Sequence, residues 1–309
     1  MIKKTLYFGN PTYLSLRNRQ IVIKLPEIEN SDALSETFKK STETTRPIED
    51  VGIVVLDHKR ITFTTGLMEA LLENKCAVIT CDSKSMPHGL MLPLSGNTLQ
   101  NERFRHQLEA SLPLKKQLWQ QTIKAKIENQ ADVLESCIHS GVKCMKVWAG
   151  EVKSGDADNV EARAAAYYWR NMFPNVDNFT REREGSAPNN LLNYGYAILR
   201  AVVARALVIS GMLPTLGIHH HNRYNAYCLA DDIMEPYRPF VDELVFNMFH
   251  SYDCEELTRE IKGKLLSIPT LDVHIGDCCS PLMVAVSQTT ASLYKCFKGE
   301  SRLIMYPRY

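Results

Sequence analysis

The sequence predicts an α+β protein of two domains, a small β-sandwich-like N-terminal domain followed by a larger all-α C-terminal domain. Short β-branched runs crowd the first hundred residues, whereas apolar residues beyond them recur with helical spacing. At 309 residues the chain is long enough for two domains that each bury a core. We assign residues 1–97 to the first domain and residues 98–309 to the second, which carries the candidate site.

Short apolar runs bounded by polar residues predict the strands of the first domain, at residues 19–25, 52–56, 60–64 and 76–81. One helix, which follows Thr65 and Gly66, interrupts them. The stretch 27–46 is polar and charged, and we expect a loop or hairpin there. Prolines and glycines between residues 87 and 97 then indicate the domain boundary.

Helical spacing predicts the second domain's helices at residues 103–111, 115–140, 161–173, 191–210, 240–250, 254–266 and 281–298. Lysines 115, 116, 124 and 126 are interpreted as one solvated helix face. Tyr194 and Tyr196 are interpreted as helix core.

Composition limits the protein class. The net charge is +1, so any DNA-binding track must be a local patch. Nine cysteines, an odd number without CxxC spacing, indicate reduced thiols rather than disulfides or a zinc site. Neither a signal-peptide core nor an apolar run long enough for a bilayer is apparent, so we expect a cytoplasmic protein without a membrane partner. GxGxxG, GxxxxGK[ST] and GxSxG motifs are absent from the sequence.

The strongest candidate for chemistry is the run Gly217-Ile218-His219-His220-His221, followed by Asp231, Asp232 and Glu235. Residues three apart share a helix face, so Asp232 and Glu235 are expected to be neighbours. Glu161 opens another helix upstream. If the fold brings Glu161 to that face, the group would hold a divalent cation able to activate an oxygen nucleophile.

Each part of this candidate site also has a purely structural interpretation. Glu161 could complete a capping box with Asp158. The histidine triplet could be a solvated turn, and the acids could form the first turn of a helix, favoured by the macrodipole. Pro236 argues weakly against that last interpretation, because a proline inside a helix is unfavourable.

Motifs spread over nearly the whole chain resemble those of CRISPR-associated protein one, the adaptation integrase of CRISPR–Cas immunity. The matching segments are Leu6-Tyr7-Phe8-Gly9-Asn10-Pro11, Pro47-Ile48-Glu49-Asp50-Val51-Gly52, Cys81-Asp82 with Pro87, Ala187-Pro188-Asn189-Asn190 and Asp232-Ile233-Met234-Glu235-Pro236-Tyr237-Arg238. The Met-Glu-Pro-Tyr-Arg form is similar to the members that accompany type II systems.

The resemblance implies a metal-dependent DNA endonuclease and integrase that inserts short foreign DNA fragments as spacers by 3′-OH transesterification. It implies that Glu161, His220 and Glu235 bind Mg²⁺ or Mn²⁺, with Asp232 as a further catalytic acid. His220 is preferred within the triplet because it lies three residues after Gly217.

The implied partners are prespacer and repeat DNA, a second copy in a homodimer, a small ferredoxin-like CRISPR-associated protein two, and other type II adaptation factors. Two alternatives remain, a non-catalytic DNA-binding scaffold and an unrelated helical metallohydrolase.

Overall fold

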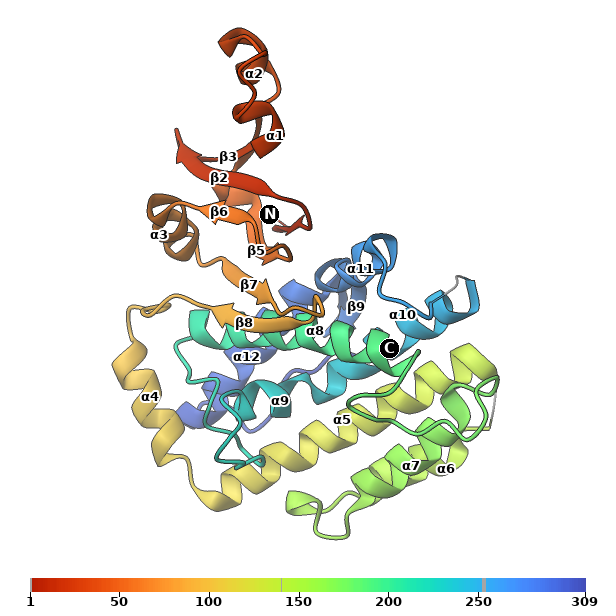
Figure 1. Ribbon diagram of the computed structural model, residues 1–309. Coiled ribbons are helices and arrows are strands. Elements are labelled where there is room, and N and C mark those ends of the chain that lie inside the picture. Colours follow the sequence, from red (N-terminus) through yellow and green to blue (C-terminus); the bar gives the residue numbers. More distant parts are fainter. Residues whose placement is uncertain (1, 140, 252–253) are drawn as a thin grey trace. The chain divides into compact units, whose positions relative to one another are not determined.

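A computed structural model describes residues 2–139, 141–251 and 254–309 of the chain. The chain divides into two compact units, Met1–Leu94 and Ser95–Tyr309 (Figure 1). The division lies just before the predicted boundary at residue 97, within the stretch of prolines and glycines.

The first unit contains two four-stranded sheets. One has the order β1-β5-β7-β8, in which β1, β5 and β7 are parallel and β8 is antiparallel to β7. The other has the order β4-β3-β2-β6, with β6 parallel to β2 and the remaining pairs antiparallel. The strands are β1 (Lys4–Phe8), β2 (Thr12–Arg17), β3 (Gln20–Lys24), β4 (Thr44–Pro47), β5 (Val51–Leu56), β6 (Ile61–Phe63), β7 (Ala77–Cys81) and β8 (Pro87–Met91).

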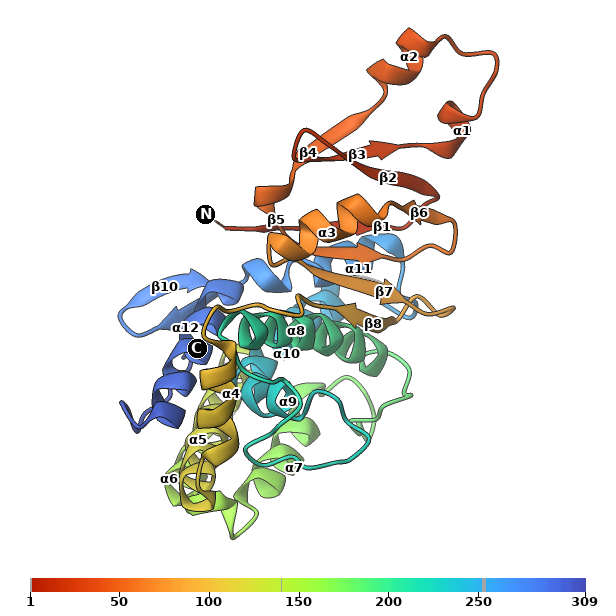
Figure 2. The same ribbon diagram turned by 90° about the vertical axis from the view of Figure 1, so that its left-hand side faces the viewer.

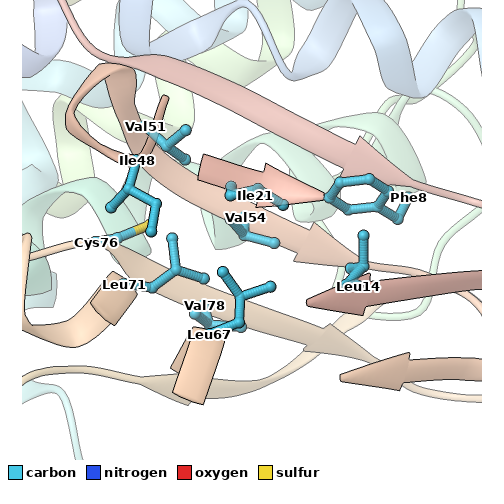
Figure 3. Close-up of a cluster of buried hydrophobic side chains, with 10 residues drawn as sticks. All are labelled: Phe8, Leu14, Ile21, Ile48, Val51, Val54, Leu67, Leu71, Cys76 and Val78. Carbon is cyan, nitrogen blue, oxygen red and sulfur yellow. The ribbon is translucent and has the colours of Figure 1, made fainter. Parts of the chain in front are cut away.

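One buried cluster joins both sheets of this unit (Figure 3). Phe8 and Val54 come from the first sheet, Leu14 and Ile21 from the second. Leu71 and its neighbours on helix α3 (Thr65–Glu73) pack against the same cluster. Apolar faces of two sheets and a helix therefore share one core, and the predicted β-rich N-terminal region is confirmed.

The stretch 27–46 is a hairpin excursion, the second of the two predicted alternatives, because β4 pairs antiparallel with β3. The excursion is more structured than a loop. It contains two short helices, α1 (Pro26–Glu29) and α2 (Glu36–Ser41), and then β4. Pro26 opens α1, where its missing N–H has no intrahelical partner to lose. Ser35 caps α2 by accepting a hydrogen bond from the N–H of Phe38. Local capping chemistry therefore outweighs the polar composition of this segment.

The second unit is predominantly helical (Figures 1 and 2). Its helices are α4 (Gln100–Glu109), α5 (Leu112–Ile138), α6 (Lys143–Glu151), α7 (Val160–Met172), α8 (Asn189–Ile209), α9 (Cys228–Met234), α10 (Arg238–Ser251), α11 (Arg259–Leu265) and α12 (Leu282–Lys298). Helix α5 contacts α6, α7, α9 and α10, whereas α12 packs beside α8 and α4. The periodicity missed α6 and α9, which are short enough to show few helical repeats.

The prediction of an all-α second domain is wrong in one place. Strands β9 (Asp272–Ile275) and β10 (Cys278–Pro281) pair as an antiparallel hairpin. Val273 and Ile275 are buried and alternate with exposed residues, and Gly276 has a φ of +59° at the turn. Alternation over so few residues is a weak signal beside a long apolar helix.

Helix α8 corrects a second expectation. It is long and apolar enough, by length and composition, to cross a membrane. However, 72% of its apolar window is buried inside the protein, as expected for the core helix of a globular unit. Tyr194 and Tyr196 on this helix are buried, so their interpretation as helix core is confirmed.

Candidate metal centre

Glu161 lies in the first turn of α7, but it does not cap that helix. The side chain of Asp156 accepts hydrogen bonds from the N–H groups of Val160 and Glu161, at 2.9 and 3.1 Å. Asp158, the proposed partner in a capping box, instead pairs with Lys153 at 2.7 Å. The capping interpretation of Glu161 is therefore wrong, and its carboxylate is available for another role.

That carboxylate meets a buried lysine. The Lys126 ammonium, from the middle of α5, lies 2.6 Å from Glu161 Oε1 and 2.6 Å from Glu235 Oε2. The Lys126 side chain is only 10% exposed, against 28% for Glu161 and 7% for Glu235. Two carboxylates from separate segments thus converge on one cation.

Glu235 begins a short 3-10 helix, Glu235–Tyr237, directly after α9. Pro236 therefore occupies the start of a helical turn, where a missing N–H is tolerated, rather than a helix interior. Arg238 Nε lies 2.9 Å from Glu235 Oε1. Burial alone would raise the pKa of Glu235, but the positive charges of Arg238 and Lys126 outweigh it and lower that pKa to about 2.

Asp232 organises the histidine turn. Its carboxylate accepts hydrogen bonds from the backbone N–H groups of Ile218, His219 and His220, at 2.7, 3.0 and 3.2 Å. Gly217 is required beside it, since an added Cβ would lie 2.4 Å from the His220 carbonyl oxygen and 2.7 Å from Asp232 Oδ2. Asp232 is completely buried, so these donors compensate its desolvation.

The same carboxylate orients His220. Asp232 Oδ1 lies 2.5 Å from His220 Nδ1, and this hydrogen bond raises the pKa of His220. With Nδ1 engaged, Nε2 is the ring nitrogen left to bind a metal. The negative charge of Glu235 also contributes to the raised pKa of His220, which places these two groups within electrostatic reach of each other.

The three histidines are not equivalent. His219 stacks flat on Trp119 of α5, with ring centroids 4.1 Å apart and planes 1° apart. His220 meets the same indole edge-on, at 5.6 Å and 84°. His221 is exposed. The turn is therefore held by Asp232 from one side and by Trp119 from the other, with His219 used for packing.

Asp231, beside Asp232, points elsewhere. Its Oδ1 lies 2.6 Å from Arg200 Nε, and its Oδ2 accepts a hydrogen bond from Asn225 Nδ2 at 2.7 Å. Asp231 therefore anchors the loop that follows the histidines and takes no part in the Glu161–Lys126–Glu235 bridge.

Helix α5 supplies the supporting residues, which the sequence interpretation missed. Trp119, Lys126 and Asn129 are all buried, and Asn129 Nδ2 donates to the carbonyl oxygen of Pro236 at 2.8 Å. The assignment of Lys126 to a solvated face is wrong. Its spacing from Trp119 and Ile123 places it on the buried side of α5, and this register was the signal available in the sequence. Lys124, by contrast, is 55% exposed.

A groove of 340 Å³ opens beside His220. Lys115 and Arg223 line it together with the side chains of Asn222 and Asn225. Cations and amides of this kind suit the phosphate oxygens of a nucleic acid strand. Lys115 and Arg223 are the cationic side chains among its lining residues.

The donor set fits a divalent cation. Two carboxylates and an imidazole are hard and borderline ligands that Mg²⁺ and Mn²⁺ accept. Within residues 2–139, 141–251 and 254–309, however, no three His, Cys, Asp or Glu side chains already converge as ligands. The ammonium of Lys126 separates Glu161 from Glu235 and takes the place of a shared cation.

Comparison with known proteins places this chain in a family. The family described as CRISPR associated protein Cas1 matches residues 6–267. The CRISPR-associated endonuclease Cas1 of Neisseria meningitidis is 37% identical over 278 residues, which cover 89% of this chain and 85% of that protein. The CRISPR-associated endonuclease Cas1 2 of Pyrobaculum aerophilum is 25% identical over 81% of this chain and 88% of its own length.

Solved structures share the fold at low sequence identity. A casposase bound to its integration product superposes with a TM-score of 0.77 at 19% identity, over 98% of this chain and 92% of that chain. A Cas6-RT-Cas1–Cas2 complex superposes with a TM-score of 0.72 at 18% sequence identity, over 97% of this chain and 35% of that chain. A TtCas1–DNA complex superposes with a TM-score of 0.60 at 15% sequence identity, over 95% of this chain and 91% of that chain. From the family match and the Neisseria relative together, we conclude that the chain belongs to the Cas1 family of CRISPR-associated proteins.

Proposed function

We propose that this protein is a metal-dependent DNA endonuclease and integrase of CRISPR adaptation, which inserts short DNA fragments as new spacers by 3′-OH transesterification. The observation that carries the proposal is the convergence of Glu161 and Glu235 on one cation position in the unit that also holds His220. Phosphoryl transfer depends on such positioning and charge neutralisation more than on covalent help from the protein.

Glu161, His220 Nε2 and Glu235 would hold a Mg²⁺ or Mn²⁺ ion. When bound, such an ion polarises the scissile phosphate and favours ionisation of the attacking hydroxyl. Asp232 acts through His220, because it fixes the imidazole through Nδ1 and holds the backbone of the turn. Water in place of the 3′-hydroxyl would give hydrolysis at the same site.

DNA is proposed to enter along the groove beside His220. Lys115 and Arg223 would contact phosphates there, while Asn222 offers a neutral donor. Contacts of this kind carry little sequence information, and affinity should fall steeply as salt rises.

The proposed assembly follows the family. Two homodimers of this chain would be joined by a dimer of the small ferredoxin-like CRISPR-associated protein two, with other type II factors assisting. Solved relatives described as complexes with Cas2 and with DNA support these partners. Such an assembly would act in the cytoplasm, where invading DNA and the CRISPR array are both reached.

An integration assay on a supercoiled plasmid that carries the repeat tests the proposal. Full-site insertion is expected with Mg²⁺ or Mn²⁺ and the small partner present, and none after EDTA. The chain alone should form a dimer and give only half-site joining or slow nuclease activity. DNA binding without strand transfer in any metal would establish the alternative, a non-catalytic scaffold of the adaptation complex.

A further inference from the structure

The bridge between Glu161 and Glu235 is already charge-balanced by the protein itself. Lys126 and Arg238 supply two positive charges against the two carboxylates, with Lys126 contacting both acids and Arg238 contacting Glu235. A divalent cation that enters this position therefore meets carboxylates that already have partners.

The position of the lysine distinguishes it from an ordinary stabilising pair. Lys126 is 10% exposed, and its ammonium lies at 2.6 Å from an oxygen of each proposed ligand. An apolar side chain would often stabilise a buried helix position as well as an ion pair does. A cation aimed at both carboxylates instead keeps two like charges close together, which would otherwise repel each other.

The same contact opposes the metal. An ammonium and a divalent ion that share two carboxylates repel each other strongly in a buried site, so both cannot occupy the gap. We propose that Lys126 is an internal counter-ion of the metal centre, a positioning residue that holds Glu161 and Glu235 together and competes with the divalent cation for their oxygens. This inference rests on the proposed function, in which these two acids bind the metal.

Because Lys126 competes with the metal, the positive charge of Lys126 determines how tightly the metal binds. Removing the positive charge should free both carboxylates for the metal and tighten its binding, as for any two ligands with an unfavourable coupling. The apoprotein should lose thermal stability at the same time, because Glu161 and Glu235 then face each other without the shared cation. The two effects have opposite signs, which a merely structural lysine would not produce.

Mn²⁺ binding by the full-length protein, followed by the EPR signal of the free ion, measures this directly. K126M removes the charge and keeps the length of the side chain, whereas K126Q removes the charge and keeps hydrogen-bond donors. We expect both variants to bind Mn²⁺ roughly tenfold more tightly than the wild type. K126M should also melt at a lower temperature without metal and recover the difference when Mn²⁺ is added. If K126M does not fold, K126Q alone decides the question.

Lys124 provides a matched control on the same helix, because it is exposed and pairs with Glu128 only at 3.9 Å. K124M loses the same charge and should bind Mn²⁺ as the wild type does. Equal or weaker Mn²⁺ binding by the Lys126 variants, or an equal gain in K124M, would overturn the inference while leaving the proposed function intact. Absence of Mn²⁺ binding in every protein, wild type included, would refute both.

Discussion

Two buried carboxylates in the second unit, Glu235 and Asp242, lie in opposite electrostatic environments. Burial pushes the pKa of each upward. At Glu235 the charges of Arg238 and Lys126 overcome burial, and the pKa falls to about 2. At Asp242 hydrogen bonds from Tyr196 and Tyr168 offset burial only in part, and the pKa stays raised at about 7. Cations in direct contact hold Glu235 ionised, whereas at Asp242 the two hydroxyl donors and the charges of Arg238 and Arg181 do not together overcome burial.

The different pKa values of Glu235 and Asp242 accompany different roles in the structure. The carboxylate of Asp242 accepts hydrogen bonds from Tyr196 on α8 at 2.5 Å and from Tyr168 on α7 at 3.0 Å. It thereby ties α10 to α8 and to α7, the helix whose first turn contains Glu161. Glu235 is held ionised and faces the ammonium of Lys126. Arg238 connects the two clusters, since it contacts Glu235 and its guanidinium lies 4.5 Å from the centre of the Tyr196 ring.

The largest expected effect comes from neutralising the cation-facing pair. E235Q and E161Q should each lower the rate of integration at least about a hundredfold, as expected when a metal ligand is lost. E161Q should keep its fold, because Glu235 still compensates Lys126. E235Q also removes the carboxylate that faces Arg238 and should melt at a lower temperature than E161Q. Integration assays beside thermal melting measure both quantities. Normal integration by a protein that melts early would mean that the pair is structural.

The histidine triplet should respond unequally. H220A removes the imidazole that Asp232 orients and should lower integration about as severely as E235Q does. H219A removes the ring stacked on Trp119 and should lower the melting temperature more than the activity. H221A, which changes an exposed ring, should resemble the wild type in both. Equal activity of all three variants would show that none is a ligand.

The sequence drew attention to the candidate ligands but not to the residues that support them. Glu235 lies in a segment that resembles the family, whereas Glu161 was singled out by its place at the start of a helix and His220 by its spacing from Gly217. Lys126, Trp119 and Asn129 lie on one helix far from those motifs, and only the fold brings them to the site. A lysine in a helix ordinarily indicates a solvated face. The residue type of Lys126 therefore led to a wrong interpretation, although its register places it on the buried side of α5.

In the fold, too, some elements could be predicted from the sequence and others could not. Long periodic segments such as α5, α8 and α12 were predicted close to their bounds because many residues contribute to the pattern. The strands β1, β2 and β8, the hairpin β9–β10 and the helices α1, α2 and α6 were missed, and only the end of α9 near Asp232 was expected to be helical. Each is short, so capping residues and tertiary contacts decide its structure more than periodicity does.

The variant D242N tests whether Asp242, unlike Glu235, titrates near neutral pH. The folded pKa of Asp242, about 7, lies above its unfolded value of 3.8, so the folded state holds the extra proton between those values. This group therefore makes the wild type less stable as pH rises from about 4 to 7, by roughly 4 kcal/mol at most.

Asparagine cannot ionise, and its amide can still hydrogen-bond both tyrosine hydroxyls. Melting temperatures from pH 5 to 8 at constant ionic strength should fall less in D242N than in the wild type. Parallel curves would show that Asp242 does not titrate in this range.

The smallest expected effect concerns the hydroxyl of Tyr168. Y168F keeps the buried ring but removes the donor that lies 3.0 Å from Asp242 Oδ2. At pH 5.5 Asp242 is protonated, and losing a hydrogen bond to a neutral acid should lower the free energy of unfolding by about 1 kcal/mol. At pH 8 the acid is ionised, and the same loss should be about 2 kcal/mol, because hydrogen bonds to charged groups are stronger. Urea unfolding at both pH values measures the difference, and Y168F in the D242N background removes the charge as a control. An effect of Y168F that is the same at both pH values, or that persists unchanged in the D242N background, would mean that this hydroxyl does not respond to the charge of Asp242.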